Sequence, residues 1–470
     1  MVMETHAPTE PRDPQAMLDP GLLNGPDAAD NARALDRTMS VGSFRTRDSA
    51  IPLRPVLLPA AQYTELVTTA LHAADLLTRV CRTRASSPEE LARLVDFVRP
   101  SVSLWSTSPR QTRWSTAMAR PDLVLSGGVP KLLELNVNSA LGGLHQVPRM
   151  DRAYASRLDI RAAAARFPFS CLNMGTVLAA LLTRVGRSIG VERPRVAILG
   201  FDHPEDRNGQ EAAYTDVIDT LRLHGLPAVY AQPQDLRLVH GRTLVHGTRV
   251  DILVRDFVTA DAADAGIDLA PLRAVVEQDA AVVLAPETGA PYASKRVLSW
   301  LTEDAPFMSP ADRQFVERHV PPTHVVRPGV LGDTPDAVLR HLWEHQPRLV
   351  LKGNQGHSAE RVAVGRECPE DRWRELTREA VARGDSVVQE LVPTDTVHVP
   401  MYDPGSGATA LVRSKAVYGP MLLDGRCGGI LTRHMDAEWG DVVRTEGGGT
   451  MNSTMAWEAA DSDGPAEGVR

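Results

Sequence analysis

Alternating polar and apolar residues between positions 131 and 138 predict a β-strand whose two faces differ in chemistry. The sequence there reads Lys-Leu-Leu-Glu-Leu-Asn-Val-Asn. Successive side chains of a strand point to opposite sides, so Glu134, Asn136 and Asn138 share one face while leucine and valine form the other. The pattern therefore predicts one face that packs into a core and one face that carries oxygen ligands.

A second, shorter strand over residues 122–126 is expected to pair with the first, because Gly127-Gly128 between them is a hairpin turn signal. A two-residue loop would place Asp122 on the face of Leu133. A three-residue loop that includes the preceding serine would place Asp122 with Glu134 and the asparagines. We predict the three-residue loop, because it gathers the carboxylates and amide oxygens in one place.

Two carboxylates and an amide oxygen are hard ligands that suit Mg²⁺, which prefers one or two carboxylates together with the phosphates of a nucleotide. The alternative is an edge hairpin whose polar face meets water, as acidic and amide side chains usually do. Arg120 lies two positions before Asp122 and shares its face if the strand extends that far. It would place a guanidinium group beside the metal, or form a plain surface ion pair.

The length of 470 residues exceeds what one hydrophobic core usually supports, so two or three domains are expected. The expected fold class is α/β (α+β). Composition and periodicity divide the chain into a disordered arm over residues 1–46, a helical segment with the hairpin over 47–190, a Rossmann-like substrate domain over 191–290, a unit with a flap over 291–456 and a disordered tail over 457–470.

The part over residues 191–290 begins with a short apolar strand at 196–200, a helix at 210–224 and a strand at 227–230. This order predicts a right-handed crossover in a partly parallel sheet. No Gly-x-Gly-x-x-Gly follows the first strand, so a dinucleotide is not expected.

A strand that ends on Lys352 is followed at once by a loop of small residues from Gly353 to Gly356, and then by a returning strand. Such a flap can lay backbone N–H groups over phosphates, and a phosphate is a credible partner for the lysine. The alternative is a solvated end of a strand. Further along, Gln389-Glu390 could present polar groups to an adenine edge or simply end a strand.

The overall charge and the cysteines narrow the class of protein. A net charge of -8 without a basic block makes nucleic acid or an anionic membrane an unexpected partner. No apolar run is long enough to span a bilayer and no export signal is present, so a cytoplasmic protein is expected. Four widely spaced cysteines argue against a disulfide framework or a structural zinc site. A homodimer is expected, because dimers are the commonest oligomers of soluble proteins.

Together these features resemble the circularly permuted ATP-grasp family, which includes glutathionylspermidine synthase. Arg120-Pro-Asp122 followed by Lys131-Leu-Leu-Glu134-Leu-Asn136 matches the family pattern, in which the metal-binding strands precede the lysine-bearing flap. The resemblance implies the following roles: Mg²⁺ ligands at Asp122, Glu134 and Asn136; a catalytic arginine at Arg120; nucleotide contacts at Lys295, Lys352, Gly353, Gly356, Gln389 and Glu390; and substrate contacts at Asn138 and Arg255.

Two departures from the family matter. The family often has proline after the flap lysine and more glycine in the flap, whereas this chain has Gly353 followed by Asn-Gln-Gly-His-Ser. A cysteine-based amidase domain before the hairpin is not expected, so the bifunctional arrangement of glutathionylspermidine synthase is not implied. The resemblance implies an ATP- and Mg²⁺-dependent carboxylate–amine ligase that joins small-molecule substrates of the amino acid, peptide or polyamine type through an acyl-phosphate. The alternatives are a non-catalytic nucleotide-binding protein and a phosphotransferase that stops after phosphorylating its substrate.

Overall fold

The structure is a computed structural model that describes residues 13–39, 50–137, 141–202, 211–303, 306–356, 361–443 and 449–458. Every structural statement below concerns these residues.

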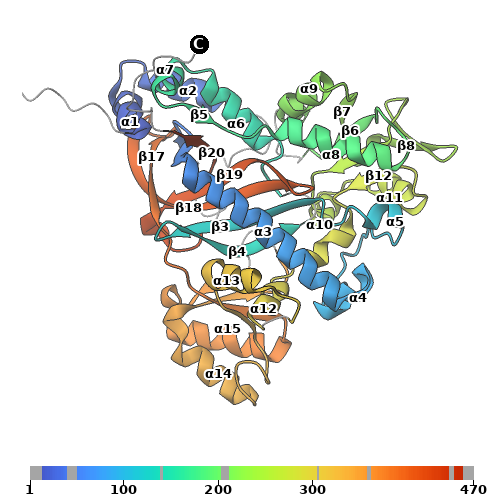
Figure 1. The fold of residues 1–470 in the computed structure, drawn as a ribbon, viewed down its shortest axis with the longest axis vertical. Coiled ribbons are helices and arrows are strands. Elements are labelled where there is room, and N and C mark those ends of the chain that lie inside the picture. The colour runs from blue at the N-terminus through green and yellow to red at the C-terminus, as the bar shows by residue number, and fades with distance from the viewer. Residues whose placement is uncertain are drawn as a thin grey trace, which may run out of the picture.

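Nine of the described strands form one large, mostly antiparallel sheet across the middle of the molecule (Figure 1). Its path runs through β1 (Ile51–Pro52), β17 (Thr396–Tyr402), β18 (Thr409–Leu423), β19 (Arg426–Asp436), β20 (Thr450–Trp457) and β2 (Val56–Pro59), with β3 (Met118–Ser126), β4 (Val129–Val137) and β5 (Phe169–Ser170) attached. The first half of β18 pairs with β17 and the second half with β3. The predicted hairpin is therefore built into the same sheet as the C-terminal strands.

The long helix α3 (Ala60–Arg84) lies across this sheet (Figure 1). Its buried residues Leu66, Ala70, Ala73 and Leu77 recur at helical spacing and pack against the apolar face of the hairpin. Each fully buried leucine of this kind contributes roughly 2 kcal/mol. Four shorter helices complete this part: α4 (Pro88–Leu94), α5 (Pro109–Thr112), α6 (Gln146–Ala155) and α7 (Leu158–Arg166).

A second sheet has four parallel strands in the order β12 (Val282–Leu284), β11 (Ile252–Arg255), β6 (Val196–Leu199) and β7 (Ala228–Ala231). Alternate residues enter two different cores: Ile198 packs with α8 (Met174–Ser188) and α9 (Thr215–Leu223), and Leu199 packs with α11 (Ala270–Glu277). Helices therefore cover both faces, as a parallel sheet requires. The remaining elements here are β8 (Leu236–Val239), β9 (Arg242–Val245), β10 (Thr248–Arg249) and α10 (Thr259–Asp264).

The third sheet is small and antiparallel, and it forms the lobe at the bottom of Figure 1. Its order is β13 (Thr323–Val325), β16 (Ser386–Glu390), β14 (Leu349–Gly353) and β15 (Val362–Val364). One face packs on α14 (Pro335–Glu344) and α15 (Glu370–Arg383) around Trp373, and the other face carries Lys352 and Gln389. Two helices, α12 (Arg296–Thr302) and α13 (Pro310–His319), precede it. We call these elements from β13 to β16 the small lobe.

The expectation of a disordered arm over residues 1–46 is wrong for its central part. Residues 14–39 form α1 (Pro14–Asn24) and α2 (Ala28–Met39), whose sparse apolar residues, such as Leu18 and Leu35, share a core with β1 and α6. These helices gain their stability from that shared core, which local composition does not reveal. The expected tail begins inside β20, since Trp457 is its last residue. Residues 1–12, 40–46 and 459–470 lie outside the described part.

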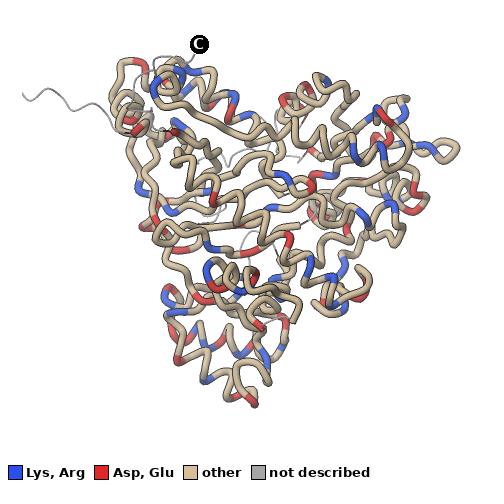
Figure 2. The backbone as a smooth tube through the Cα atoms, viewed as in Figure 1, with Lys and Arg blue, Asp and Glu red and all other residues tan. Residues whose placement is uncertain are grey.

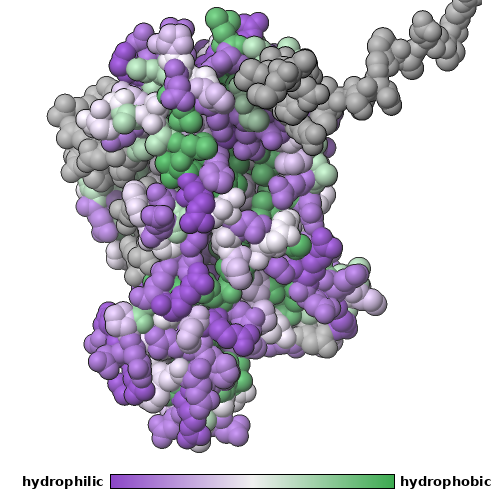
Figure 3. All heavy atoms as spheres, turned by 90° about the vertical axis from the view of Figure 1, so that its left-hand side faces the viewer, coloured by the Kyte–Doolittle hydropathy of each residue, from purple (hydrophilic) through white to green (hydrophobic). Residues whose placement is uncertain are grey.

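The described helices include none that combines the length and the apolar character needed to cross a membrane. Figure 2 shows basic and acidic residues interspersed along the described chain, without a large block of either sign. The small lobe at the bottom of Figure 3 presents a mainly hydrophilic surface.

Removal of the ion pair between Asp19 and Arg54 would test whether the N-terminal helices stabilise the fold. Arg54 is 1% exposed and its Nε donates to Asp19 Oδ1 at 2.6 Å. We expect Asp19→Ala to lower the free energy of unfolding by about 3 kcal/mol, because it leaves a buried guanidinium without its counter-charge. Denaturant titration measures this loss. The control Asp30→Ala breaks an exposed pair with Arg33 on the neighbouring helix and should cost far less, because water screens the two charges. Equal effects would contradict the structural role of α1.

Burial of His434 in β19 predicts a loss of stability in acid. Burial, with a smaller contribution from Arg54, lowers the pKa of His434 to about 4, whereas an unfolded histidine has a pKa near 6.5. Between these pH values the unfolded chain binds more protons, so stability falls as the pH drops from about 6.5 to 4, by roughly 3 kcal/mol for this group. His434→Gln should flatten that part of the stability curve. Parallel curves for the two proteins would contradict the assignment.

Candidate active site

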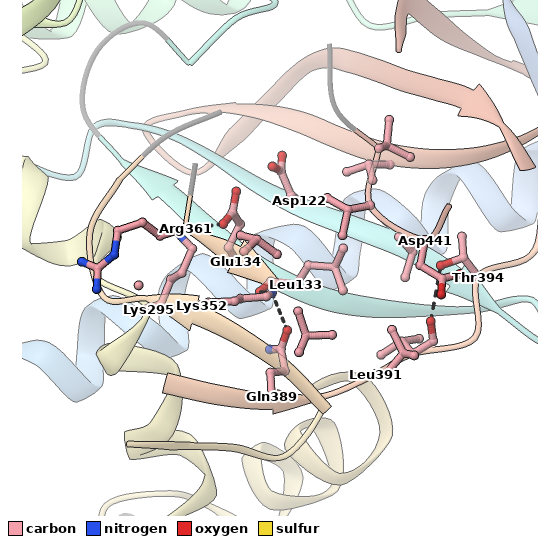
Figure 4. Close-up of a pocket in the computed structure, with 18 of the residues that line it drawn as sticks. Asp122, Leu133, Glu134, Lys295, Lys352, Arg361, Gln389, Leu391, Thr394 and Asp441 are labelled. Carbon is pink, nitrogen blue, oxygen red and sulfur yellow. Dashed lines mark hydrogen bonds and ion pairs between the residues drawn. The ribbon is translucent and has the colours of Figure 1, made fainter. Parts of the chain in front are cut away.

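A cleft between the hairpin and the small lobe encloses about 1130 Å³ of empty space that is open to solvent. One wall comes from β3, β4, β18 and β19 of the large sheet, and the other from β14, β15 and β16 of the small lobe. Two connecting segments, residues 391–394 and 441–443, also contribute. In Figure 4, Asp122 and Glu134 project side by side from the hairpin, while Lys352 points toward Gln389.

The hairpin brings the two carboxylates together by a route that differs from the predicted one. The three-residue loop is wrong: Ser126 pairs with Val129, so the loop is Gly127-Gly128 alone. The register then shifts between Asp122 and Leu123, because Leu133 is an extra, unpaired residue on β4. This β-bulge moves Glu134 opposite Asp122, so both carboxylates share the face of the cleft.

Two arginines hold Asp122, which is 2% exposed. Arg120 donates to Oδ1 from Nε at 2.9 Å and to Oδ2 from Nη2 at 3.3 Å. Arg433 from β19 also donates to Oδ2. Space for Arg120 exists because Gly419 faces it, and a Cβ there would lie 2.6 Å from Arg120 Cδ. The predicted metal ligand Asp122 therefore serves first to fix two guanidinium groups.

Sequence reasoning missed Arg433. A charged residue inside the otherwise mostly buried run of β19 was the available signal, since an arginine is rarely placed there without a partner. Its partner could not be read from the sequence, because β18 separates β19 from β3 in the sheet.

Glu134 faces the small lobe from the opposite wall. Lys295 Nζ lies 3.2 Å from Glu134 Oε2. Burial raises the pKa of Glu134, but the positive charges of Lys295, Lys352 and Arg433 outweigh that effect, so the pKa is held below its usual range. The structure thus brings Glu134 together with both predicted nucleotide lysines.

Lys352 is fixed from both walls. Its Nζ donates to Gln389 Oε1 at 2.6 Å and to the carbonyl oxygen of Leu133 at 3.2 Å. Gln389 in turn donates from Nε2 to Thr323 Oγ1 at 2.9 Å. Burial lowers the pKa of Lys352 to about 8, against the opposing effect of Glu134. Gln389 therefore orients the lysine, and its contact with adenine stays a prediction.

The other predicted nucleotide residues lie around the same cleft. Gly353, Gly356 and Glu390 line it, and Lys295 Nζ donates to the Gly356 carbonyl oxygen at 3.4 Å. The flap residues 357–360 lie outside the described part. Arg361, which sequence reasoning did not select, also lines the cleft and pairs with Asp385.

The oxygen atoms of Asp122, Glu134 and Asn136 suit a metal ion that binds together with a nucleotide. They suit a metal ion held by protein ligands alone less well. Asn136 donates from Nδ2 to the Arg120 carbonyl oxygen at 3.2 Å, which leaves its Oδ1 as an acceptor. Glu134 supplies a carboxylate, whereas both oxygens of Asp122 already accept hydrogen bonds. In the described part of the chain, no group of three or more His, Cys, Asp or Glu residues is arranged to hold a metal. Mg²⁺ needs only one or two carboxylates when phosphates complete its shell.

The predicted substrate residue Arg255 does not line this cleft. Arg255 is 1% exposed, lies in β11 of the parallel sheet and is not among the residues that line the cleft. Its guanidinium donates to the carbonyl oxygens of Ala285 and Phe257 and to Thr259, and burial lowers its pKa to about 10. Its contact with a substrate stays a prediction. Asn138 lies outside the described residues.

Comparison with known proteins shows that the fold is similar to that of a solved structure. No known protein family profile matches the sequence, and no similar sequence was found among curated proteins. Among solved structures, the apo form of GSS30, a glutathione synthetase-like effector from Globodera pallida, is similar with a TM-score of 0.58 and 16% identity, over 95% of this chain and 99% of that chain.

Two further structures are less similar in shape. A protein from Methylobacillus flagellatus assigned as a gamma-glutamylcysteine synthetase has a TM-score of 0.36 and 11% identity, over 85% of this chain and 87% of that chain. The ATP-grasp ligase PsnB, complexed with a minimal precursor, has a TM-score of 0.27 and 15% identity, over 57% of this chain and 90% of that chain. The chain thus has a mixed α/β fold similar to that of a glutathione synthetase-like protein, in agreement with the resemblance read from the hairpin motif.

Proposed function

We propose that this protein is an ATP- and Mg²⁺-dependent carboxylate–amine ligase that forms an amide bond. One observation carries the proposal: Glu134 lies in an open cleft between Lys295 and Lys352, beside Asp122. Carboxylates on one wall and lysines on the other suit a metal-bound polyphosphate between them. The fold shared with a glutathione synthetase-like protein supports the same class of reaction.

We further propose that the architecture is an ATP-grasp fold in circularly permuted order. The hairpin β3–β4 precedes the small lobe in the chain. The strands β17 to β20, which follow the small lobe, join this hairpin in the large sheet. The four parallel strands between β6 and β12 would then be the Rossmann-like substrate domain. This order explains why residues that meet in one cleft come from both halves of the sequence.

The residues of the cleft have separate tasks in this proposal. Glu134 and the Oδ1 atom of Asn136 would hold Mg²⁺, and Lys295 and Lys352 would oppose the charge of the phosphates. When bound, MgATP supplies a phosphoryl group to the substrate carboxylate, and an amine then displaces phosphate to give the amide. Arg120, held by Asp122, would face the negative charge that develops on the substrate.

The substrates are proposed to be a small carboxylic acid and a small amine of the amino acid, peptide or polyamine type. The test is to incubate the protein with MgATP and a metabolite pool, and to find the required acid and amine by leaving out one compound at a time. ADP release that needs both an acid and an amine supports the ligase. ADP release without an amine, with a stable phosphorylated product, would indicate a phosphotransferase, and no ADP release would favour a nucleotide-binding protein without catalysis.

A substitution of Glu134 is the most direct test of this proposal by mutation. We expect Glu134→Gln to lower ADP release by about 100-fold or more, because the amide cannot replace the negative charge toward the metal. A coupled assay for ADP measures the rate, and circular dichroism confirms the fold. The control Glu65→Gln removes a surface charge that pairs with Arg318 and should retain full activity. Undiminished ADP release by Glu134→Gln would remove this residue from the proposed mechanism.

A further inference from the structure

A second cavity lies among α2, α6 and the start of α9, in the upper part of Figure 1, whereas the small lobe forms the bottom. It encloses about 1130 Å³ of empty space that is open to solvent, and it shares no lining residue with the cleft. Its described lining includes three arginines, Arg149, Arg152 and Arg157, and one acidic residue, Asp216. We call it the arginine cavity. The proposed ligase reaction leaves this cavity without a function.

Most of the uncharged polar side chains that line the arginine cavity are already engaged. The hydroxyl groups of Thr38, Ser156 and Thr215 donate to backbone carbonyl oxygens three or four residues earlier in the chain, at 3.1, 2.7 and 3.1 Å. A hydroxyl has only one hydrogen to donate, so these groups offer no donor to a ligand. The guanidinium groups and the amide of Asn31 are therefore the donors that a ligand would meet.

Arg157 has an N–H group that is not yet used. Its side chain is 9% exposed, and its Nε and Nη2 donate to the two oxygens of Asp159 at 3.0 and 2.6 Å. Its Nη1 is buried and has no hydrogen-bond partner among the described residues. Buried N–H groups are nearly always paired, because an unpaired group loses its bonds to water without compensation. A ligand acceptor beside Arg157 would supply the missing partner.

The positive charges around the arginine cavity are only partly offset. Arg149 Nε donates to a carbonyl oxygen of α2 at 3.0 Å, and Nη1 to one of the short helix η1 (Glu211–Tyr214) at 2.9 Å. Burial lowers the pKa of Arg149; Asp216 opposes this effect and Arg152 adds to it. Arg152 itself pairs with Asp216. The three guanidinium groups thus meet two carboxylates, those of Asp216 and Asp159, and one positive charge is left over.

We propose that the arginine cavity binds a small oxyanion of the phosphate or carboxylate type, and that the bound anion ties α2 to the start of α9. A guanidinium group suits both ligand classes, because its planar fork of N–H groups matches two oxygen atoms. The walls of the cavity belong to the N-terminal helices, the large-sheet part and the parallel-sheet unit. A bound anion would therefore join three parts of the fold, and this role does not depend on the proposed function.

The experiment titrates the full-length protein with inorganic phosphate and with succinate by isothermal titration calorimetry, each against sodium chloride at the same ionic strength. We expect at least one of the two anions to bind, and Arg152→Gln and Arg157→Gln each to weaken that binding about tenfold, as the loss of one hydrogen bond to a charged group predicts. The stronger ligand identifies the anion class. The matched control Arg33→Gln removes an arginine of α2 that pairs with Asp30 and does not line the cavity, and it should leave binding unchanged.

Hydrogen exchange tests the second half of the inference. The bound anion should slow amide exchange in α2 and at the start of α9 in the wild-type protein, and should have little effect in Arg157→Gln. Arg152 has a side chain that is 73% exposed, so Arg152→Gln should keep the fold even if loss of the buried Arg157 side chain disturbs it. Circular dichroism checks both variants.

A cleft variant separates this cavity from the candidate active site, which an anion could also enter. Lys352→Met should leave binding in the arginine cavity intact. Binding that Lys352→Met abolishes and both arginine variants retain would place the anion in the cleft, and would overturn this inference while the proposed function stands. Failure of both anions to bind the wild-type protein would also overturn it, as would binding that does not slow exchange in α2. Absence of ligase activity would remove the proposed function and leave this inference untouched.

Discussion

One extra residue in β4 determines how the candidate site is assembled. Leu133 is unpaired in the ladder between β3 and β4, and from that point Asp122 faces Glu134 across the hairpin. The same bulge leaves the Leu133 carbonyl oxygen outside the ladder, where it accepts a hydrogen bond from Lys352 at 3.2 Å. A single distortion thus aligns two carboxylates on one wall of the cleft and docks a lysine from the other wall.

The charges of the cleft explain why this arrangement is stable without a ligand and still suits an anion. Arg120 and Arg433 surround Asp122, while Lys295 and Lys352 surround Glu134. Partly buried charges remain ionised only when partners offset their loss of water. These four cations exceed these two carboxylates by two, but Arg361, Glu390 and Asp441 also line the cleft, so the positive excess is confined to the surroundings of Asp122 and Glu134. A local excess of positive charge at this end of the cleft favours a polyphosphate over a neutral ligand there.

Local patterns in the sequence predicted much of the secondary structure. The alternation in β4, the turn at Gly127-Gly128 and the parallel strands around β6 all follow from side-chain periodicity and turn chemistry. The same patterns could not show the bulge, because Leu132 and Leu133 are identical in kind and only the pairing with β3 distinguishes them. The N-terminal helices were missed for a similar reason, since their apolar surface is small and becomes a core only on the large sheet.

The charged side chains of the cleft come from different elements, and these elements determine which contacts join the two walls. The carboxylates and arginines belong to the large sheet, whereas Lys352 belongs to β14, and the Lys295 segment is joined to the end of that strand through Asn354. The bond between Lys352 and Gln389 lies within the small lobe, so it would survive any movement of that lobe. The contact of Lys352 with Leu133 crosses the cleft and would not survive it. Lys295 lies outside the small lobe, directly before α12, whose Val297 and Leu298 share a core with α3. Lys352 therefore opposes the carboxylates only while the small lobe is docked, and a ligand with negative charge on the side of Lys352 and a divalent cation on the carboxylate side would strengthen that docking.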